Sequence, residues 1–179
     1  MRPWRLVDEQ EVGAFSVFSL RRRVMENPRN GHQHPFFVVD TANWVNVVAL
    51  TAEGQLVLVR QIRAGTAAPT LEIPGGVVDP GEDLATAALR ELAEETGYVA
   101  NHAIEIGTVH PNPALMSNRC TTFVVTGARL ESAQELDPAE DIEVLLRPLA
   151  DADAMINSGE ITHALVVAAL DHYRRHLLR

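Results

Sequence analysis

The chain has 179 residues, 46% of them hydrophobic and 22% charged, a balance that predicts one globular domain with at most a small N-terminal addition. Its formal net charge of −9 disfavours a nucleic-acid partner, because binding to a phosphate backbone normally needs a basic surface. No apolar run approaches the roughly 20 residues that span a bilayer, so no membrane partner is expected.

The cysteine content and the opening residues bear on the compartment. A single cysteine, Cys120, excludes an intrachain disulfide and a multi-cysteine zinc cluster, and it fits a reducing environment. The first residues, MRPWRLVDEQEV, are polar and of mixed charge, so they lack the apolar core of a signal peptide. Together these features predict a cytoplasmic protein.

Strand-like runs dominate the first part of the chain. The pattern FSVFSLRRRV at 15–24 partly alternates and predicts a strand, and the turn-rich NPRNGHQHP follows at 27–35. FFVVD, WVNVVAL and QLVLVRQIR are also strand-like, and AEG at 52–54 joins the last two as a hairpin. A short LEI then precedes two glycines.

A helix is expected after the turn DPG at 79–81. Apolar residues recur there near helical spacing, at Leu84, Ala87, Ala88, Leu89 and Leu92. Gly97 is a natural C-terminal stop for this helix. Strands return at 102–110, 120–130 and 141–149, and a last helix covers ITHALVVAALDHYRRHLL. Many strands and few helices, without strict βαβ alternation, predict an α+β fold with a mixed sheet.

Three acidic residues, Glu91, Glu94 and Glu95, lie three or four positions apart and so share one face of this helix. Their like charges repel, and Arg90 is the only cation in the segment. Hard divalent cations such as Mg²⁺ take carboxylate oxygens and would relieve the repulsion. A solvated acidic helix face is the alternative. Against it, the carboxylates border an apolar stripe and follow two glycines, where a backbone carbonyl can approach a metal.

The spacing from Gly76 through Glu82 to RELAEETGY at 90–98 resembles the full signature of the Nudix hydrolases. The resemblance implies a Nudix fold, in which a mixed β-sheet is sandwiched between α-helices. It also implies hydrolysis of a nucleoside diphosphate linked to another group, with Mg²⁺ or Mn²⁺ as cofactor. The implied metal ligands are the Gly75 carbonyl, Glu91, Glu94 and Glu95, with Glu82 as a ligand or a neighbour of one. Arg90 would orient these carboxylates, and Glu94 would share or bridge a metal through water.

Outside the signature, LVRQIRAGTAAPTLEIPGG at 58–76 resembles the ADP-ribose and nucleoside diphosphate sugar branch of the family. That branch splits the pyrophosphate bond into a nucleoside monophosphate and a sugar phosphate. Candidate substrate contacts in this stretch are Arg60, Arg63 and Glu72. The two arginines are an odd number of positions apart, so on a regular strand only one faces the cleft. Solvated strand arginines are the alternative.

A second stretch, HPNPALMSNRCTTFVV at 110–125, adds further candidate substrate contacts. Pro113 lies about where the resemblance to ADP-ribose pyrophosphatases places a proline, and Asn118 and Arg119 follow in a polar loop. These two could bind substrate or a neighbouring subunit. A rigid turn before a strand explains the proline equally well.

The general base is expected, by resemblance to the same branch, in the acidic loop ELDPAEDIEV at 135–144. Glu140 is the first choice, ahead of Asp141, Asp137 and Glu143. A solvated acidic loop is the alternative.

Two other residue types are expected to play no part in the chemistry. The sequence shows no arrangement that would activate the thiol of Cys120, so we expect this cysteine to be a small buried residue of a strand. His163, His172 and His176 of the last helix have no acidic or cysteine partner at ligand spacing, so structural or exposed positions are expected for them.

The domain organisation follows from the same pattern. Residues 1–40 are predicted to form a small antiparallel β-extension, and residues 41–179 the Nudix hydrolase domain. In relatives with this layout the extension exchanges across a homodimer, so the resemblance implies a homodimer. Two other functions stay open: a hydrolase that removes nucleoside triphosphates, and a non-catalytic Nudix module that senses a nucleotide. The arginine stretch and the extension favour the nucleotide-sugar hydrolase over the first, and the complete acidic signature favours it over the second.

Overall fold

The computed structural model describes the whole chain, residues 1–179, as ten strands, three α-helices and one short 3₁₀ helix. It divides into two units, Met1–Asn43 with His110–Arg119, and Trp44–Val109 with Cys120–Arg179. The loop 110–119 groups with the N-terminal strands because its backbone pairs with Val39. The Val39 N–H donates to the Leu115 carbonyl at 2.8 Å, and the Ser117 N–H donates to the Val39 carbonyl at 3.1 Å.

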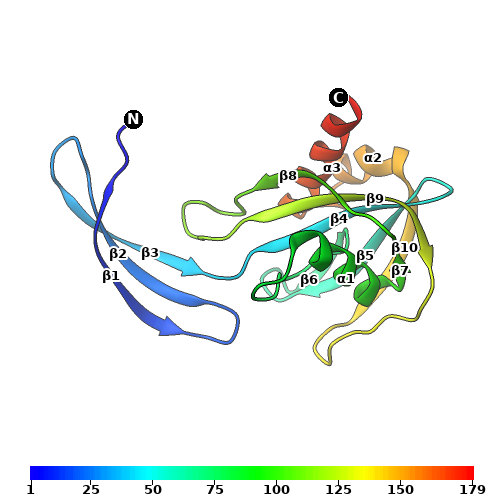
Figure 1. Cartoon of the computed structure of the whole chain (residues 1–179), viewed down its shortest axis with the longest axis horizontal. Helices are drawn as coiled ribbons and strands as arrows, with labels where there is room; N and C mark the ends of the chain where they lie inside the picture. The colour runs from blue at the N-terminus through cyan, green and yellow to red at the C-terminus, as the bar shows by residue number, and fades with distance from the viewer. The chain divides into compact units, whose positions relative to one another are not determined.

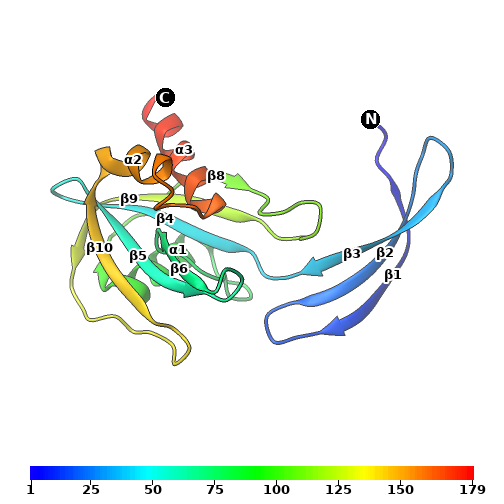
Figure 2. The ribbon, with the colours of Figure 1, turned by 180° about the vertical axis from the view of Figure 1, so that it is seen from behind.

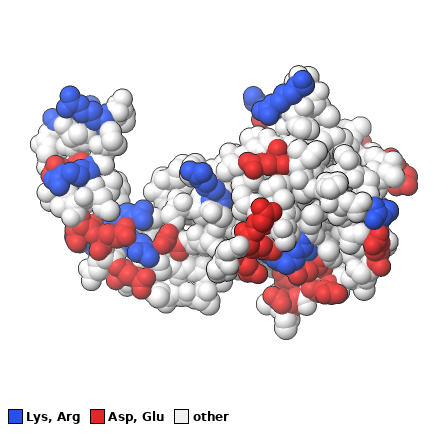
Figure 3. Space-filling model, in the orientation of Figure 1, with Lys and Arg blue, Asp and Glu red and all other residues white.

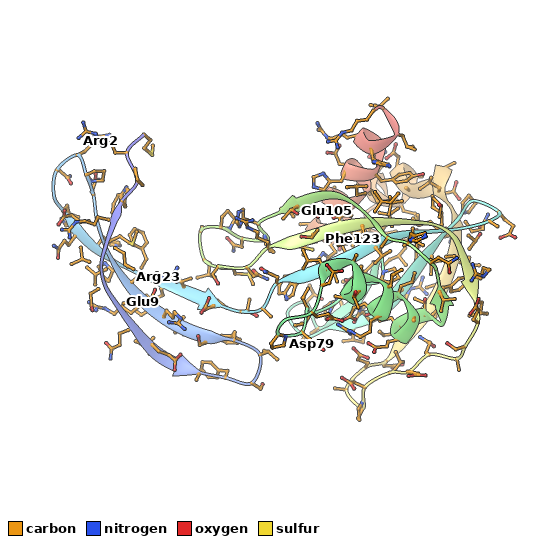
Figure 4. The ribbon with its side chains drawn as sticks, in the orientation of Figure 1. Arg2, Glu9, Arg23, Asp79, Glu105 and Phe123 are labelled. Carbon is orange, nitrogen blue, oxygen red and sulfur yellow. The ribbon has the colours of Figure 1, made fainter.

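The first unit is built on an antiparallel sheet of β1 (Arg5–Ala14), β2 (Ser19–Glu26) and β3 (Gln33–Asp40), in that order (Figure 1). The Phe15 N–H donates to the Phe18 carbonyl at 2.9 Å, so the start of the predicted strand at 15–24 is a turn and the strand itself is β2. β1 has no apolar pattern of its own. It pairs with β2 through the antiparallel backbone ladder and through side-chain ion pairs, in which the Glu9 carboxylate accepts hydrogen bonds from Arg21 and Arg23 (Figure 4).

The second unit contains the seven-stranded sheet. Its strands are β4 (Trp44–Thr51), β5 (Gln55–Arg63), β6 (Ala68–Glu72), β7 (Tyr98–Val99), β8 (Ile104–Val109), β9 (Cys120–Leu130) and β10 (Ile142–Pro148). Their order is β10-β5-β4-β9-β7, with β6 paired to β5 and β8 paired to β9. β4 and β9 run parallel and the other pairs are antiparallel, which confirms the predicted mixed sheet.

Helices cover both faces of this sheet (Figures 1 and 2). Helix α1 (Leu84–Thr96) lies on one face, and α2 (Ala152–Asn157) and α3 (Ala164–Leu177) lie on the other. Side chains of β4 alternate between two buried clusters, with Val47 in the α1 cluster and Val48 in the α3 cluster. The layers confirm the α+β architecture. The short α2, which follows the 3₁₀ turn Leu149–Asp151, was not predicted, because six residues show too little periodicity. None of the helices is long and apolar enough to cross a membrane.

Capping fixes the register of α1. The Asp83 carboxylate accepts from the N–H groups of Ala85 and Thr86, each at 3.1 Å, and so satisfies free donors of the first turn. Gly97 ends the helix at φ 73°, a conformation that favours glycine, and its N–H donates to the Ala93 carbonyl at 2.8 Å. The helix therefore stops where the sequence predicts.

The first half of β4 is paired on one side with a loop instead of a strand. The Val45 N–H donates to the Gly76 carbonyl at 3.0 Å, and the Val47 N–H donates to the Pro74 carbonyl at 2.8 Å. β5 approaches β4 near Leu50 and Leu56. The loop between β6 and α1 is thus held against the central strand by ladder-like bonds.

Candidate active site

Two glycines bring this loop close to both β4 and α1. A Cβ on Gly75 would lie 2.3 Å from the Val45 carbonyl oxygen, and a Cβ on Gly76 would lie 2.5 Å from a carboxylate oxygen of Glu91. Neither site has room for a larger residue. The Gly75 N–H donates to the Glu95 carboxylate at 2.9 Å, while the Gly75 carbonyl accepts no hydrogen bond from the chain. That oxygen is the one that the sequence assigns to a metal.

Arg90 connects three of the predicted carboxylates. Its Nε and Nη2 each donate to Glu82 at 2.9 Å, and its Nη1 donates to Glu91 at 3.0 Å and to Glu94 at 2.9 Å. The Arg90–Glu82 contact requires the chain before α1 to fold back, and Gly81 at φ 83° makes this turn. Five donors in a rigid fork suit a guanidinium to this task. Arg90 thereby offsets the repulsion between the acidic side chains.

The surroundings of Glu91 and Glu95 disfavour the ionised form of both carboxyl groups. Burial raises the pKa of Glu91, and it raises the pKa of Glu95 to about 8 against the opposing Gly75 hydrogen bond. The side chain of Glu95 is 5% exposed. Glu94 is more open, with 42% of its side chain exposed. No three His, Cys, Asp or Glu side chains of the chain are grouped closely enough to hold a metal ion as they stand.

The acidic loop before β10 is tied to the end of α1. The Gln134 side-chain amide donates to the Glu95 carbonyl at 2.6 Å and to the Ile142 carbonyl at 3.0 Å, and the Glu135 N–H donates to the Glu94 carbonyl at 2.9 Å. Glu140 lies near enough for its charge to contribute to the raised pKa values of Glu91 and Glu95. Figure 3 shows acidic side chains gathered over α1 and this loop. The predicted base and the predicted metal ligands therefore share one region.

The two candidate arginines of β5 face different neighbours. Arg60 forms an ion pair with Glu143 on β10 at 2.9 Å. Glu143 is one of the alternative candidates for the general base, and its carboxylate is therefore bound to an arginine. Arg63 forms a bidentate ion pair with Glu72 on β6, in which Nε donates to Oε1 and Nη2 donates to Oε2, each at 2.8 Å. The Arg63 Nη1 donates to no group of the chain, and 44% of its side chain is exposed. Arg63 therefore keeps donors for a ligand.

Glu72 is almost fully buried, at 3% exposure. Burial raises its pKa, but the hydrogen bonds from Arg63 and from the Thr70 hydroxyl, at 2.6 Å, outweigh burial, so the net pKa lies below the ordinary value. The carboxylate is ionised and locked against Arg63. Its contacts indicate that Glu72 orients the arginine.

The remaining predicted substrate residues belong to the first unit. Asn118 is 2% exposed and its amide nitrogen donates to the Ala42 carbonyl at 3.1 Å. The Arg119 N–H donates to the Asn43 side chain at 2.9 Å, while Pro113 is exposed. These contacts explain how the loop 110–119 is shaped, and the substrate role of all three stays a prediction.

Sequence reasoning missed three contacts of this region: Thr70 with Glu72, Gln134 with the end of α1, and His163 with Glu72. The Nε2 of His163 lies 4.0 Å from the Glu72 carboxylate. The contacts of Gln134 and His163 join residues that are distant in sequence, so no local pattern carries them. Thr70 and Glu72 are two positions apart on β6, and this spacing puts both side chains on one face of the strand. Cys120 is where the sequence predicts, buried in β9, and burial raises the pKa of its thiol to about 12.

Comparison with known proteins gives a consistent answer. The family model described as the NUDIX domain matches residues 41–170. The ADP-ribose pyrophosphatase of Bacillus subtilis (strain 168) is 30% identical over 94% of this chain and 91% of that protein. The methanol dehydrogenase activator of Bacillus methanolicus is 29% identical over 94% of each. A crystal structure of an ADP compounds hydrolase superposes with a TM-score of 0.88 at 25% identity, covering 99% of this chain and 95% of that one.

Proposed function

Because the chain belongs to the Nudix hydrolase family, we propose that it hydrolyses the pyrophosphate bond of ADP-ribose or a related nucleoside diphosphate sugar. The products are a nucleoside monophosphate and a sugar phosphate. The observation that carries the proposal is the position of half-buried Glu91 and buried Glu95 beside the loop that contains Gly75 and Gly76, called the glycine loop below. The chain is also similar over nearly its whole length to a protein named ADP-ribose pyrophosphatase.

A divalent metal, Mg²⁺ or Mn²⁺, fits the residues of this site. Glu91 and Glu95 are carboxylates whose pKa values are raised by burial, and the Gly75 carbonyl oxygen makes no hydrogen bond to the chain. Hard cations prefer such oxygen ligands. We propose these three as the metal-binding groups, with Glu94 and Glu82 beside them. A cation bound there would neutralise the pyrophosphate charge and acidify a bound water.

The other residues have distinct tasks in this proposal. Arg90 holds Glu82, Glu91 and Glu94 in place through its hydrogen bonds and does not touch the substrate. Arg63, fixed by Glu72, donates from Nη1 to the pyrophosphate oxygens. Glu140 accepts the proton of the attacking water, because its carboxylate lies near the charged centre on a loop anchored to α1.

The first unit favours a homodimer. None of residues 1–43 is buried, and several large apolar side chains of this segment are exposed, among them Phe15 at 60%, Val17 at 74% and Phe37 at 52%. A small sheet without a core needs cover to be stable in water. We propose that a second copy of this chain supplies it, and light scattering behind a sizing column measures the mass directly. A cytoplasmic location, favoured by the single cysteine, also stays a proposal.

One assay separates this function from its alternatives. The protein is incubated with Mg²⁺ or Mn²⁺ and ADP-ribose, ADP-glucose, GDP-mannose, diadenosine polyphosphates and nucleoside triphosphates, and the products are identified by mass. AMP and ribose phosphate from ADP-ribose are expected. Turnover of nucleoside triphosphates alone would refute this proposal and would favour the alternative, a hydrolase that removes nucleoside triphosphates. Binding without any turnover would favour the non-catalytic module.

A further inference from the structure

His163 lies at the junction between α3 and Glu72. Its Nδ1 accepts a hydrogen bond from the Leu165 N–H at 3.2 Å and so caps the helix. Because Nδ1 acts as an acceptor, the proton of the neutral imidazole is on Nε2. That nitrogen lies 4.0 Å from Oε2 of Glu72. The ring therefore directs an N–H group, and not a lone pair, at the buried carboxylate.

The donors around Glu72 are unevenly distributed. Oε1 accepts from Arg63 Nε at 2.8 Å and from the Thr70 hydroxyl at 2.6 Å, whereas Oε2 accepts only from Arg63 Nη2, at 2.8 Å. An ionised carboxylate offers about four acceptor positions, and leaving buried ones unused is costly. His163 is the next polar side chain on the Oε2 side, with its Nε2 at 4.0 Å, a polar contact longer than a hydrogen bond.

The start of α3 is held in a fixed position, which also fixes the contact between His163 and Glu72. Val166 and Leu170 pack in the cluster beneath the helix, and the Asn46 amide of β4 donates to the Leu165 carbonyl at 3.4 Å. The position of the imidazole is thus set by the core of the unit. Displacing Glu72 from it would also turn the guanidinium of Arg63, which Glu72 holds by two parallel bonds.

We propose that His163 is a positioning residue for the hydrolysis, holding the Glu72 carboxylate so that Arg63 presents its Nη1 group to the pyrophosphate. The inference rests on the proposed function and adds to it a residue that contacts no substrate. It differs from a plain helix cap, in which only Nδ1 matters. The two ring nitrogens can be tested separately, because an asparagine amide replaces Nδ1 and a glutamine amide reaches the place of Nε2.

The test compares His163→Asn with His163→Gln. A polar contact at 4.0 Å is weaker than a typical hydrogen bond, so KM for ADP-ribose is expected to rise about threefold in His163→Asn, the low end of what one net hydrogen bond contributes. Its kcat should change little, because a contact made equally before and during the reaction affects KM alone. His163→Gln should keep KM within about twofold but lower the Tm by about 2–4 °C through loss of the cap.

The opposite pattern would overturn the proposal: a normal KM in His163→Asn with a raised KM in His163→Gln means that His163 acts only as a cap. His176→Asn is the matched control, since it makes the same change in the same helix away from Glu72, and its KM should equal that of the wild type. A raised KM in this control would also count against a specific role for His163.

A second measurement does not need turnover. The Arg63 Nε–H signal, assigned by its loss in Arg63→Lys, reports the bond to Glu72 through its exchange with water. Exchange is expected to be about threefold faster in His163→Asn and unchanged in His163→Gln, on the scale of one net hydrogen bond. Equal rates in all three proteins would overturn the inference. If the wild type does not hydrolyse ADP-ribose, the proposed function fails, and this signal still decides the role of His163.

Discussion

The Glu95 carboxylate accepts a 2.9 Å hydrogen bond from the Gly75 N–H, which joins helix α1 to the glycine loop. Glu95 is almost fully buried, and the Gly75 carbonyl accepts no hydrogen bond from the chain. A positive charge is the natural complement of this pair, since burial alone disfavours the ionised form of Glu95. The relationship gives the first prediction.

Glu95→Gln should keep the fold and reduce kcat by several orders of magnitude, because an amide has no net charge with which to hold a divalent cation. Activity is measured with ADP-ribose and Mg²⁺, and folding by circular dichroism. Glu105→Gln, at an exposed position of β8, is the matched control and should be fully active. Near-normal activity of the Glu95 variant would refute the metal assignment.

The stability of the metal-free protein should depend on Glu95. Its pKa of about 8 in the folded state exceeds the ordinary value of 4.5, so the folded chain binds this proton more tightly than the unfolded chain. The resulting stabilisation is complete below pH 4.5 and is lost as the pH rises to about 8. At about 1.4 kcal/mol for each pKa unit, the loss amounts to several kcal/mol. Glu91, whose pKa is also raised by burial, acts in the same direction.

Urea unfolding in EDTA between pH 5 and 8.5 measures this effect. The free energy of unfolding of the wild type is expected to fall across that range. In Glu95→Gln the side chain at position 95 cannot titrate, so the free energy of unfolding should fall clearly less over the same pH range. Parallel curves for the two proteins would mean that the Glu95 carboxyl is not protonated in the folded state.

Gly76→Ala should weaken metal binding. The added Cβ would lie 2.5 Å from the Glu91 carboxylate, so this side chain has to move away from the loop. A rise of at least about tenfold in the dissociation constant for Mn²⁺ is expected, as for other disturbances around metal ligands. Gly65→Ala is the control, because a Cβ there meets nothing within 4 Å. Equal Mn²⁺ affinities, measured by calorimetry, would contradict the predicted role of Glu91.

Glu140→Gln should lower kcat by about 100-fold or more and leave KM nearly unchanged, as expected for the loss of a general base. The amide keeps the size of the side chain, which can still accept the 3.0 Å hydrogen bond from the Asp137 N–H. Glu135→Gln tests the same charge change in the same loop and should be close to wild type. If only the Glu135 variant is slow, the base lies elsewhere in the loop.

Sequence patterns predicted the parts of this molecule that depend on local periodicity. Helix α1 begins and ends at Asp83 and Gly97 because each cap acts within one turn. β9 occupies the predicted range 120–130 because its apolar run is continuous. The mixed sheet followed from the count and order of such runs, and the acidic face of α1 followed from helical spacing.

What escaped prediction depends on contacts between distant residues. β1 is polar, and only the arginines of β2 explain why it is a strand. Arg63 is separated from Glu72 by a loop and Arg60 from Glu143 by 83 positions, so the spacing of the two arginines could not predict these partners. Likewise, the acidic neighbour of His163 is Glu72, which lies far from it in sequence on β6.

The bonds between β4 and the glycine loop also provide a reporter. The amide protons of Val45 and Val47 are shielded from water by the carbonyls of Gly76 and Pro74. They can exchange with deuterium only when the loop lifts from the strand, whereas their neighbours in the ladder with β9 exchange when the sheet itself opens. Comparing the exchange rates of these two sets of protons would therefore measure how often the glycine loop opens while the sheet stays folded.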